Sequence, residues 1–294
     1  MGIAIRPIQP RFVAEISGID ISRPLDRETT MTIEAAIEDN GVIVFRDQSL
    51  SDDQQIAFAR LLGEPERYVL SYRKGIKLRL GSPEMVDVSN LDADTGRPQH
   101  GETRHRMINL GNRLWHSDSS FRLPCGGLSM LFAHAVPPSG GETEFADTRA
   151  AFDALPEESR GKLVTLSAEH SLMHSRATLG FTDFSPEERS ALPPVRQPLV
   201  RSFGRAGRKA LYLGAHASHI VGMPVPEGRM MLLELLEHAT QRQFVYRHTW
   251  RVGDMVLWNN RCTLHRGMPF DETHARELRR VTTNDETAAR PLAA

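Results

Sequence analysis

The stretch LSMLFAHAVPPSGGETEF, residues 128–145, carries the clearest signal of fold class. An apolar run at 128–136 is followed by the turn residues Pro-Pro-Ser-Gly-Gly at 137–141 and by a second run at 143–145. Short apolar runs bounded by proline and glycine are typical of buried strands, and a turn cluster between two runs is typical of antiparallel pairing. The stretch therefore predicts two antiparallel strands.

The same pattern recurs along the rest of the second half of the chain. Further apolar runs separated by turn signals lie at 199–202, 210–213, 244–250, 255–258 and 278–283. Helical patterns interrupt these runs at about 148–154, 156–165 and 227–240. The sequence therefore predicts a mainly β protein with an antiparallel core and flanking helices.

Toward the N-terminus the pattern changes to helix, strand and helix. A helical pattern around 30–38 ends at Asn40-Gly41, where glycine suits the left-handed residue that follows a helix, and residues 41–45 have the pattern of a buried strand. Ser51 and Gln54 have the spacing of a capping box, and Gly63 stands at the expected end of that second helix. We expect these elements to pack beside the β core.

Residues 73–113 are rich in glycine, proline and charge, with a strand expected at 85–89 and a turn at 92–96. A loop of this length is often a lid over a site, and a tolerated surface insertion is the other interpretation. The length of the chain fits one domain. We expect residues 1–294 to form a single domain with 73–113 as a mobile loop or lid.

The composition argues against several kinds of partner. Hydrophobic residues make up 40% of the chain, and 36 Lys and Arg are interleaved with 37 Asp and Glu, so neither nucleic acid nor an anionic membrane is expected to bind. No apolar stretch reaches the roughly 18 residues of a membrane span, and residues 1–10 lack the core of a signal peptide, which predicts a cytoplasmic location. Cys125 and Cys262 lie far apart and indicate neither a disulfide framework nor a zinc site.

The sharpest local motif is WHSDSSF, residues 115–121. In a strand, residues i and i+2 project from the same face, so His116 and Asp118 would converge as a pair of metal ligands. A His-x-Asp triplet also arises by chance. His265, after the apolar run 253–258, would complete a set of two histidines and one carboxylate. That set leaves iron positions open for other ligands, although zinc hydrolases use the same residue types.

A basic segment follows His265. A strand would put Arg276, Leu278 and Arg280 on one face. An inward arginine needs an anion, because an unpaired buried guanidinium is costly. A dicarboxylate co-substrate would supply that anion.

These segments, together with PPSGGETEF at 137–145, GAHASH at 214–219 and the helix at 227–240, resemble the taurine/2,4-dichlorophenoxyacetate dioxygenase family. The resemblance covers nearly the whole chain and is closest to the aryloxyalkanoate branch. It implies a double-stranded β-helix, or cupin-like jelly roll, with iron at its mouth.

The resemblance also implies roles for individual residues. Iron(II) would be bound by His116, Asp118 and His265, and the distal carboxylate of 2-oxoglutarate by Thr143 and Arg276. The other end of 2-oxoglutarate would chelate the metal.

Four further residues are implied in substrate binding. Arg280 and Asn112 would contact an anionic substrate, and His216 and His219 are looser candidates for the pocket wall. The spacing of the two histidines would also suit a second metal site, for which no neighbouring carboxylate motif is present. The remaining histidines near apolar residues are expected to be structural: His134, His170, His174, His238 and His248.

Two departures from the family pattern bear on the site. Many relatives have Trp-Asp-Asn where this chain has Trp258-Asn259-Asn260, so we expect a charge near His265 to be missing. Phe203 replaces a histidine of the phenoxyacetate enzymes, and we expect it to make the substrate pocket more apolar.

The implied activity is that of an iron(II)- and 2-oxoglutarate-dependent dioxygenase of herbicide degradation, with O2 as co-substrate and ascorbate as reductant in assays. The expected substrate is a small anionic molecule such as a phenoxyacetate, with a taurine-like sulfonate or another small carboxylate as the alternative. A zinc hydrolase on the same ligands and a jelly roll that only binds an anion are the alternatives from other classes. We also expect a homo-oligomer.

Overall fold

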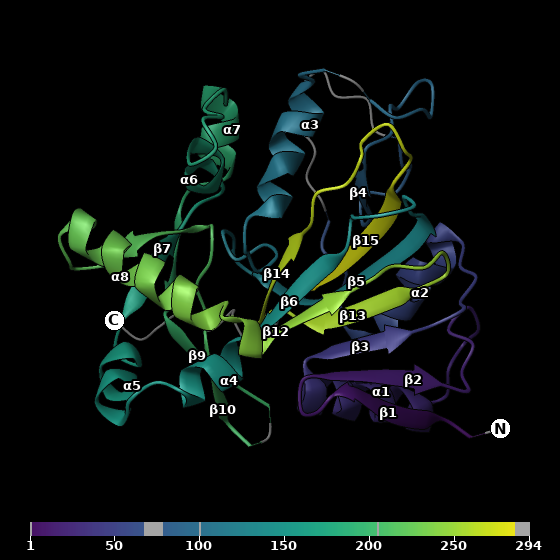
Figure 1. Cartoon of the computed structure of the whole chain (residues 1–294), viewed down its shortest axis with the longest axis horizontal. Coiled ribbons are helices and arrows are strands. Elements are labelled where there is room, and N and C mark those ends of the chain that lie inside the picture. The colour runs from purple at the N-terminus through teal and green to yellow at the C-terminus, as the bar shows by residue number, and fades with distance from the viewer. Residues whose placement is uncertain (1, 68–78, 100, 205, 286–294) are drawn as a thin grey trace.

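The computed structural model describes residues 2–67, 79–99, 101–204 and 206–285 (Figure 1). Its largest sheet has seven strands, in the spatial order β1 (Ala4–Gln9), β2 (Val13–Ser17), β3 (Val42–Phe45), β13 (Met255–Asn259), β5 (Gly126–Ala135), β15 (Glu277–Asn284) and β4 (Val86–Ser89). All neighbouring strands are antiparallel except β2 and β3. The strands predicted at 41–45, 85–89, 128–136, 255–258 and 278–283 are therefore confirmed.

A smaller antiparallel sheet packs against the large one. Its strands, in spatial order, are β12 (Val245–His248), which follows a 3₁₀ turn at Arg242–Phe244, β6 (Thr143–Asp147) and β14 (Thr263–Gly267). Phe145 of β6 lies in one buried apolar cluster with Leu131, Trp258 and Leu278 of the large sheet. Removing these side chains from water stabilises the pairing of the sheets. Along the chain, β5 of the large sheet is followed by β6 and β12 of the small one, and β13, β14 and β15 then lie in the large, small and large sheet in turn. Such crossing of the chain between two sheets is the arrangement of a jelly roll, so the predicted fold class is confirmed.

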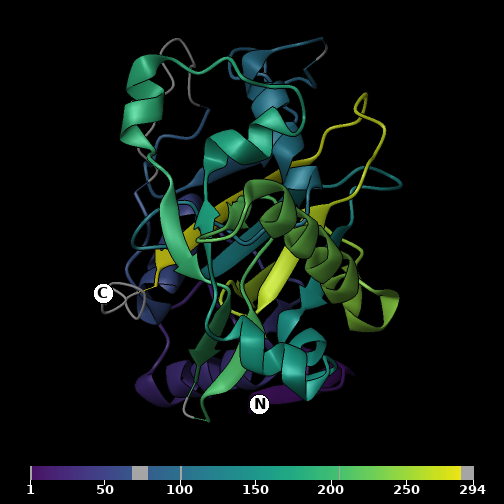
Figure 2. The ribbon, with the colours of Figure 1, turned by 90° about the vertical axis from the view of Figure 1, so that its left-hand side faces the viewer.

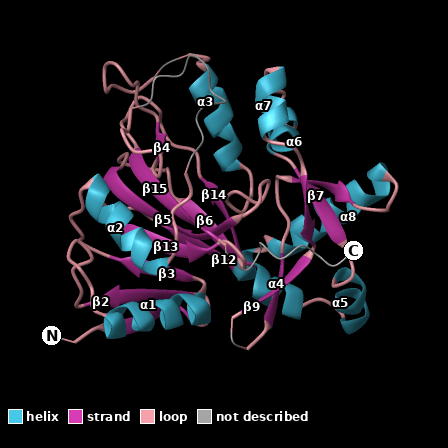
Figure 3. Ribbon diagram, turned by 180° about the vertical axis from the view of Figure 1, so that it is seen from behind, coloured by secondary structure: helices cyan, strands magenta, loops and turns pink. Residues whose placement is uncertain are grey.

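Two helices cover the outer face of the large sheet: α1 (Arg27–Asn40) and α2 (Asp52–Leu62) (Figure 3). The carboxylate of Asp26 caps the first turn of α1, and Gly41 follows its last turn with φ +88°. α2 begins with the predicted capping box, in which the side chains of Ser51 and Gln54 each bond the other's backbone N–H. The buried faces of both helices join the large sheet in a second apolar cluster.

A further layer lies beside the jelly roll (Figure 2). It contains a sheet of β11 (Ala217–Ile220), β7 (Ser167–His170) and β8 (Val195–Pro198), and a hairpin of β9 (Val200–Phe203) and β10 (Arg208–Leu211). Three helices belong to it: α4 (Thr148–Asp153), α5 (Glu157–Leu163) and α8 (Val225–Ala239). These three helices and the β9–β10 hairpin were predicted, whereas β7, β8 and β11 were not.

Short helices gather at one end of the molecule (Figure 1). They are α3 (Arg104–Asn109), which continues into a 3₁₀ turn at Leu110–Arg113, and α6 (Leu172–Ala177) and α7 (Pro186–Ala191). The expectation of a mostly structureless region at 73–113 is therefore wrong for 104–113. Thr103 caps α3, and Glu272 forms ion pairs with both Arg106 and Arg113. Residues 73–78 and 100 lie outside the described residues.

None of the helices in the described part of the chain combines the length and the apolar composition that crossing a membrane requires.

Candidate metal centre

The backbone joins the two candidate histidines. His116 N–H donates to the His265 carbonyl at 3.1 Å, and His265 N–H donates to the His116 carbonyl at 2.9 Å. His265 belongs to β14, but His116 makes only this isolated bridge, and Asp118 opens a turn in which Ser119 has φ +52°. The predicted strand through His116 and Asp118 is therefore wrong, because the chain turns away after one bridge.

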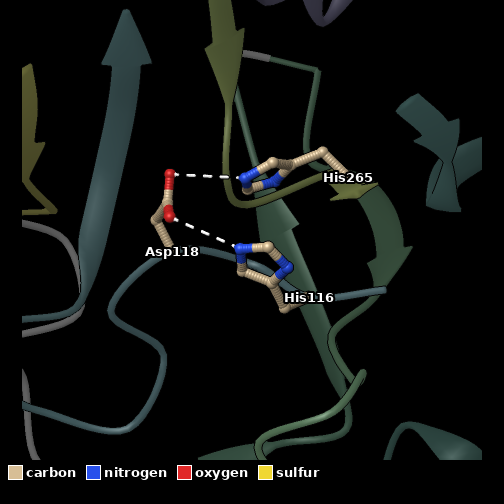
Figure 4. A group of neighbouring side chains, drawn as sticks. All are labelled: His116, Asp118 and His265. Atoms are coloured by element: carbon tan, nitrogen blue, oxygen red, sulfur yellow. Dashed lines mark ion pairs between the residues drawn. The ribbon is translucent and has the colours of Figure 1, made fainter. Parts of the chain in front are cut away.

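The three predicted ligands nevertheless converge. Figure 4 shows the Asp118 carboxylate facing a ring nitrogen of each histidine. Asp118 Oδ1 lies 3.8 Å from His116 Nε2, and Asp118 Oδ2 lies 3.7 Å from His265 Nε2. All three side chains are buried, and one donor atom from each lies within 4.8 Å of the others. Within the described residues this is the one group of three or more His, Cys, Asp or Glu side chains with such spacing.

Hydrogen bonds and burial leave the histidines suited to bind a cation. His116 Nδ1 donates to the Leu114 carbonyl at 2.7 Å, and because a carbonyl only accepts, Nε2 keeps its lone pair. Burial lowers the pKa of both His116 and His265, which keeps the imidazoles neutral. The His265 ring contacts Trp258, with centroids 4.7 Å apart, and Phe145, with centroids 6.1 Å apart.

Asp118 is held by groups from two strands of the large sheet. Ser129 Oγ of β5 donates to Oδ2 at 2.7 Å, and Arg280 Nη1 of β15 donates to Oδ1. Burial opposes ionisation of this carboxyl, but the Arg280 guanidinium and the neighbouring histidines lower its pKa below the usual value. Asn260 completes the support by accepting from the Asp118 N–H at 3.1 Å and donating to Ser129 Oγ at 2.8 Å.

Contrary to the expectation, the side chain of Asn259 contacts Arg261 and makes no hydrogen bond to His265. Its side-chain oxygen accepts from the N–H and Nε of Arg261, at 3.1 Å and 3.0 Å. An aspartate at this position would therefore face Arg261, and the amide that supports the ligands belongs to Asn260.

A cavity of about 310 Å³ opens beside the three candidate ligands. His116, Asp118 and Arg280 form one part of its wall, and α3, α6 and α7 with neighbouring residues form another: Ile108, Asn109, Asn112, Leu172, Met173, Arg176, Phe184, Glu188, Ala191 and Leu192. Its size and its mixture of apolar and charged wall residues suit a small organic molecule. The wall residues from α6 and α7 were not predicted, because neither helix was expected from the sequence.

Three of the four candidate substrate residues line this cavity, and the fourth does not. Arg280, Asn112 and His216 line it. His219 does not, because its ring faces Ser218 Oγ at 2.9 Å and lies 3.8 Å from a Glu169 oxygen on the neighbouring strand β7. Phe203 does not line the cavity either. It packs with Ala210 and Cys262, so the expectation that it makes the pocket more apolar is wrong.

Arg276 directly precedes β15 and is buried. Its Nε and Nη2 donate to the Gly141 carbonyl at 3.1 Å and 3.0 Å, and burial lowers the pKa of its guanidinium to about 10. Arg276 lines a second cavity of about 100 Å³, whose wall shares Asn109 and Asn112 with the larger one. Thr143 is buried on β6 and accepts from Trp250 Nε1 at 3.0 Å, but it lines neither of these two cavities.

A jelly roll that brings two histidines and one carboxylate together beside a cavity has the arrangement of non-haem iron oxygenases. A family model described as taurine catabolism dioxygenase TauD, TfdA family, matches residues 4–282, and the chain belongs to this family. The predicted family and enzyme class, a dioxygenase, are thereby confirmed.

Named relatives agree with this assignment. The chain is 50% identical to an alpha-ketoglutarate-dependent 2,4-dichlorophenoxyacetate dioxygenase from Cupriavidus pinatubonensis, over 97% of this chain and 99% of that protein. It is 36% identical to an (S)-phenoxypropionate/alpha-ketoglutarate-dioxygenase from Sphingobium herbicidovorans, over 92% and 91% of the two chains. A crystal structure of AAD-2 with Mn(II) and N-oxalylglycine is 46% identical, with a TM-score of 0.91 over 97% and 98% of the chains.

Proposed function

We propose that the chain is an iron(II)- and 2-oxoglutarate-dependent dioxygenase that acts on a small aryloxyalkanoate such as a phenoxyacetate. The observation that carries the proposal is the convergence of His116, Asp118 and His265 beside a cavity that also contains Arg280. The names of the most similar relatives support the substrate class. The products would be a phenol, an oxo acid, succinate and carbon dioxide.

The residues present fit iron(II). Two neutral imidazoles and one ionised carboxylate suit this ion, and the His116 Nε2 lone pair is directed by the bond from Nδ1 to Leu114. When bound with 2-oxoglutarate, iron supplies the oxidation of a substrate carbon by O2. His116, Asp118 and His265 would hold the metal, while Ser129 and the Arg280 guanidinium keep the Asp118 carboxylate ionised and oriented.

Arg276, assisted by Thr143, would bind the distal carboxylate of 2-oxoglutarate. Arg276 is buried among groups that only partly compensate its charge, since Gly141 offers a carbonyl dipole and Phe270 a ring face at 5.7 Å. A carboxylate would pair with this guanidinium in two parallel hydrogen bonds. Thr143 would need to turn its hydroxyl from Trp250.

Arg280, Asn112 and His216 would receive the substrate. Holding the substrate carboxylate would present the adjacent ether carbon to the metal side of the cavity, because reaction needs the attacked atom close to the oxidant. Hydroxylation of that carbon gives a hemiacetal, which collapses to a phenol and an oxo acid. The apolar wall residues, such as Met173 and Leu192, would surround the aryl ring and exclude water.

The test is a substrate panel. Protein with iron(II), ascorbate and 2-oxoglutarate in air is given phenoxyacetates, phenoxypropionates and taurine, and phenol and succinate are measured together. Phenol and succinate in equal amounts support the proposal. Taurine turnover without phenol from any aryloxy acid would contradict the substrate class, and turnover without O2 would point to the zinc hydrolase instead.

We propose further that residues 1–294 act as one dioxygenase domain, with the described part of 73–113 covering the cavity, and that the protein works in the cytoplasm as a homo-oligomer. The positions of Ile108, Asn109 and Asn112 in the cavity wall support the covering role. Cys125 and Cys262 are free and buried, which suits a reducing compartment. Sedimentation of the purified protein tests the assembly.

A further inference from the structure

Arg176 of α6 lies in the wall of the larger cavity, together with His116, Asp118 and Arg280. The residue is only 7% exposed, so its charge has been taken largely out of water. α6 stands at the same end of the molecule as α3 (Figure 1), and side chains from both helices meet in the cavity wall. The predicted site contains no residue of α6, so Arg176 has no assigned role.

Two neighbours fix the guanidinium of Arg176. Ser175 Oγ accepts from Nη1 at 2.9 Å and itself donates to the Leu172 carbonyl at 2.7 Å. On the other side lies Gly111, where an added Cβ would come 2.4 Å from Arg176 Cζ and 2.5 Å from Nη1. Gly111 is not among the residues with positive φ, so the close approach of the guanidinium, not the backbone conformation, calls for glycine here.

The position of Arg176 brings its charge near the metal side of the cavity. Arg176 shares the cavity wall with His216 and His116. The rings of His216 and His116 meet edge to face with centroids 5.9 Å apart. A substrate group bound by Arg176 would therefore lie close to the candidate ligands.

The acidic groups of the cavity wall are each balanced by a different arginine. Asp118 is bound by Arg280, and Glu188 by Arg104 at 2.8 Å. Glu66 faces Arg122 at 3.8 Å. An anion entering the cavity would therefore meet carboxylates whose charge is already compensated.

We propose that Arg176 binds the anionic group of the substrate together with Arg280 and is the residue that makes the enzyme require an acid. The proposal rests on the proposed function and deepens it. A guanidinium held flat by Gly111 and Ser175 is preorganised for a planar carboxylate, so little side-chain freedom is lost on binding. Arg280 already donates one N–H to Asp118, which leaves part of the recognition to a second arginine.

The test is equilibrium binding without turnover. Protein loaded with Mn(II) and N-oxalylglycine is titrated calorimetrically with phenoxyacetate and with its uncharged counterpart, phenoxyacetamide. Wild-type protein is expected to prefer the acid. In Arg176→Gln the affinity for the acid should fall by about 30-fold or more, while the affinity for the amide stays the same. Arg176→Lys should recover part of the preference.

A second variant changes the position of the Arg176 guanidinium without removing it. In Gly111→Ala the new methyl group would displace the guanidinium, whose end is flexible, so the preference for the acid should again fall while the protein stays folded. The control is Arg247→Gln, an exposed arginine outside the cavity wall that binds Glu144, which should keep the wild-type ratio of acid to amide affinity.

The outcomes are distinct. Unchanged acid affinity in Arg176→Gln, or an equal loss for acid and amide, would overturn the assignment, because the second result is that of a structural residue. A phenoxypropionate, an alkyl sulfate and taurine are titrated in parallel. If one of these binds and phenoxyacetate does not, the proposed substrate class is wrong. The effect of Arg176→Gln is then measured on the affinity for the anion that binds. If wild-type protein binds none, both proposals fail.

Discussion

Ser129 acts on the site through Asp118. Its hydroxyl donates to Asp118 Oδ2 and accepts from Asn260 Nδ2, so one side chain links the carboxylate to β5 and to the residue that follows β13. Groups that orient a metal ligand commonly change metal affinity about 10- to 100-fold when removed. Ser129→Ala should therefore raise the iron(II) concentration needed for the visible charge-transfer band with anaerobic 2-oxoglutarate by about that factor.

Two control variants accompany the iron(II) titration of Ser129→Ala. His116→Ala should abolish the band altogether. Ser218→Ala removes a buried serine that donates to the Glu169 carboxylate away from the cavity, and it should leave the iron titration unchanged. If Ser129→Ala needed no more iron(II) than wild-type protein to form the band, the Asp118 carboxylate would not depend on the hydrogen bond from Ser129.

Arg276 and Arg279 offer a matched pair for the 2-oxoglutarate site. Arg276 is buried beside Gly141, whereas Arg279 points to the other face and pairs with Glu277 and Asp52 of α2. Losing one partner of a desolvated charge pair costs about 2–5 kcal/mol. Arg276→Ala should therefore raise the Kd for 2-oxoglutarate by roughly 30-fold or more, and Arg279→Ala should not change it.

Thr143→Ala is expected to give a smaller rise than Arg276→Ala, since it removes one neutral hydrogen bond. Unchanged affinity for 2-oxoglutarate in Arg276→Ala would return that arginine to a structural role. The measurement is a titration of the anaerobic iron(II) protein with 2-oxoglutarate.

Glu66 should make stability depend on pH. Burial raises the pKa of its carboxyl to about 7, against the lowering influence of Arg122, Ser119 and Arg280, while Asp118 raises it further. The folded protein then binds more protons than the unfolded chain between about pH 4.5 and pH 7, so the free energy of unfolding falls as the pH rises through this window. The loss contributed by this group is at most about 3 kcal/mol.

Glu66→Gln removes the titrating group while keeping its shape. Urea unfolding of the metal-free protein at pH 5 and pH 8 should show the variant gaining stability relative to wild type at the higher pH. A constant difference between the two proteins across this range would mean that Glu66 is ionised at both pH values.

Among the helices and strands, α2 offers the most direct test of a structural motif that was predicted from the local sequence. Its capping box satisfies backbone N–H groups at both Ser51 and Gln54. Losing an N-cap serine typically costs about 1 kcal/mol. Ser51→Ala should lower the free energy of unfolding by that amount in urea titrations, and Gln54→Ala by less. Because the two bonds belong to one motif, the double variant should lose less than the sum, and strict additivity would contradict the reciprocal pairing.

The long helices were predictable from the sequence, whereas three of the short helices were not. α1, α2 and α8 have 11 to 15 residues and show their apolar face in the sequence. α3, α6 and α7 have six residues each, and an apolar face of fewer than two helical turns is a weak signal. They are held by caps and by distant ion pairs such as Arg104 with Glu188, which sequence spacing does not reveal.

For the molecule as a whole, the site was predictable where it follows strand geometry. The alternation of Arg276, Leu278 and Arg280 holds, because β15 keeps the same face toward the core. The approach of His116 to His265 could not be derived from periodicity, since it depends on one bridge between distant segments. The resemblance to the family supplied that pairing.

Local rules also failed for residues whose neighbours come from elsewhere in the chain. His219 follows His216 closely, yet a register shift between Ala217 and His219 accompanies its turn toward Glu169. Phe203 was placed in the pocket by comparison with relatives, but the β9–β10 hairpin directs it toward Cys262. Neither neighbour is visible in the local sequence.

The bond between Arg280 and Asp118 joins positions 162 residues apart, and this spacing has a consequence for biosynthesis. At roughly 5–20 residues per second, the ribosome delivers His116 and Asp118 on the order of 10–30 s before β15. During that interval neither His265 nor Arg280 is in place to close the site. Iron capture is thereby reserved for finished chains, and a ribosome-stalled chain that ends at residue 250 is expected to retain no iron(II) after gel filtration.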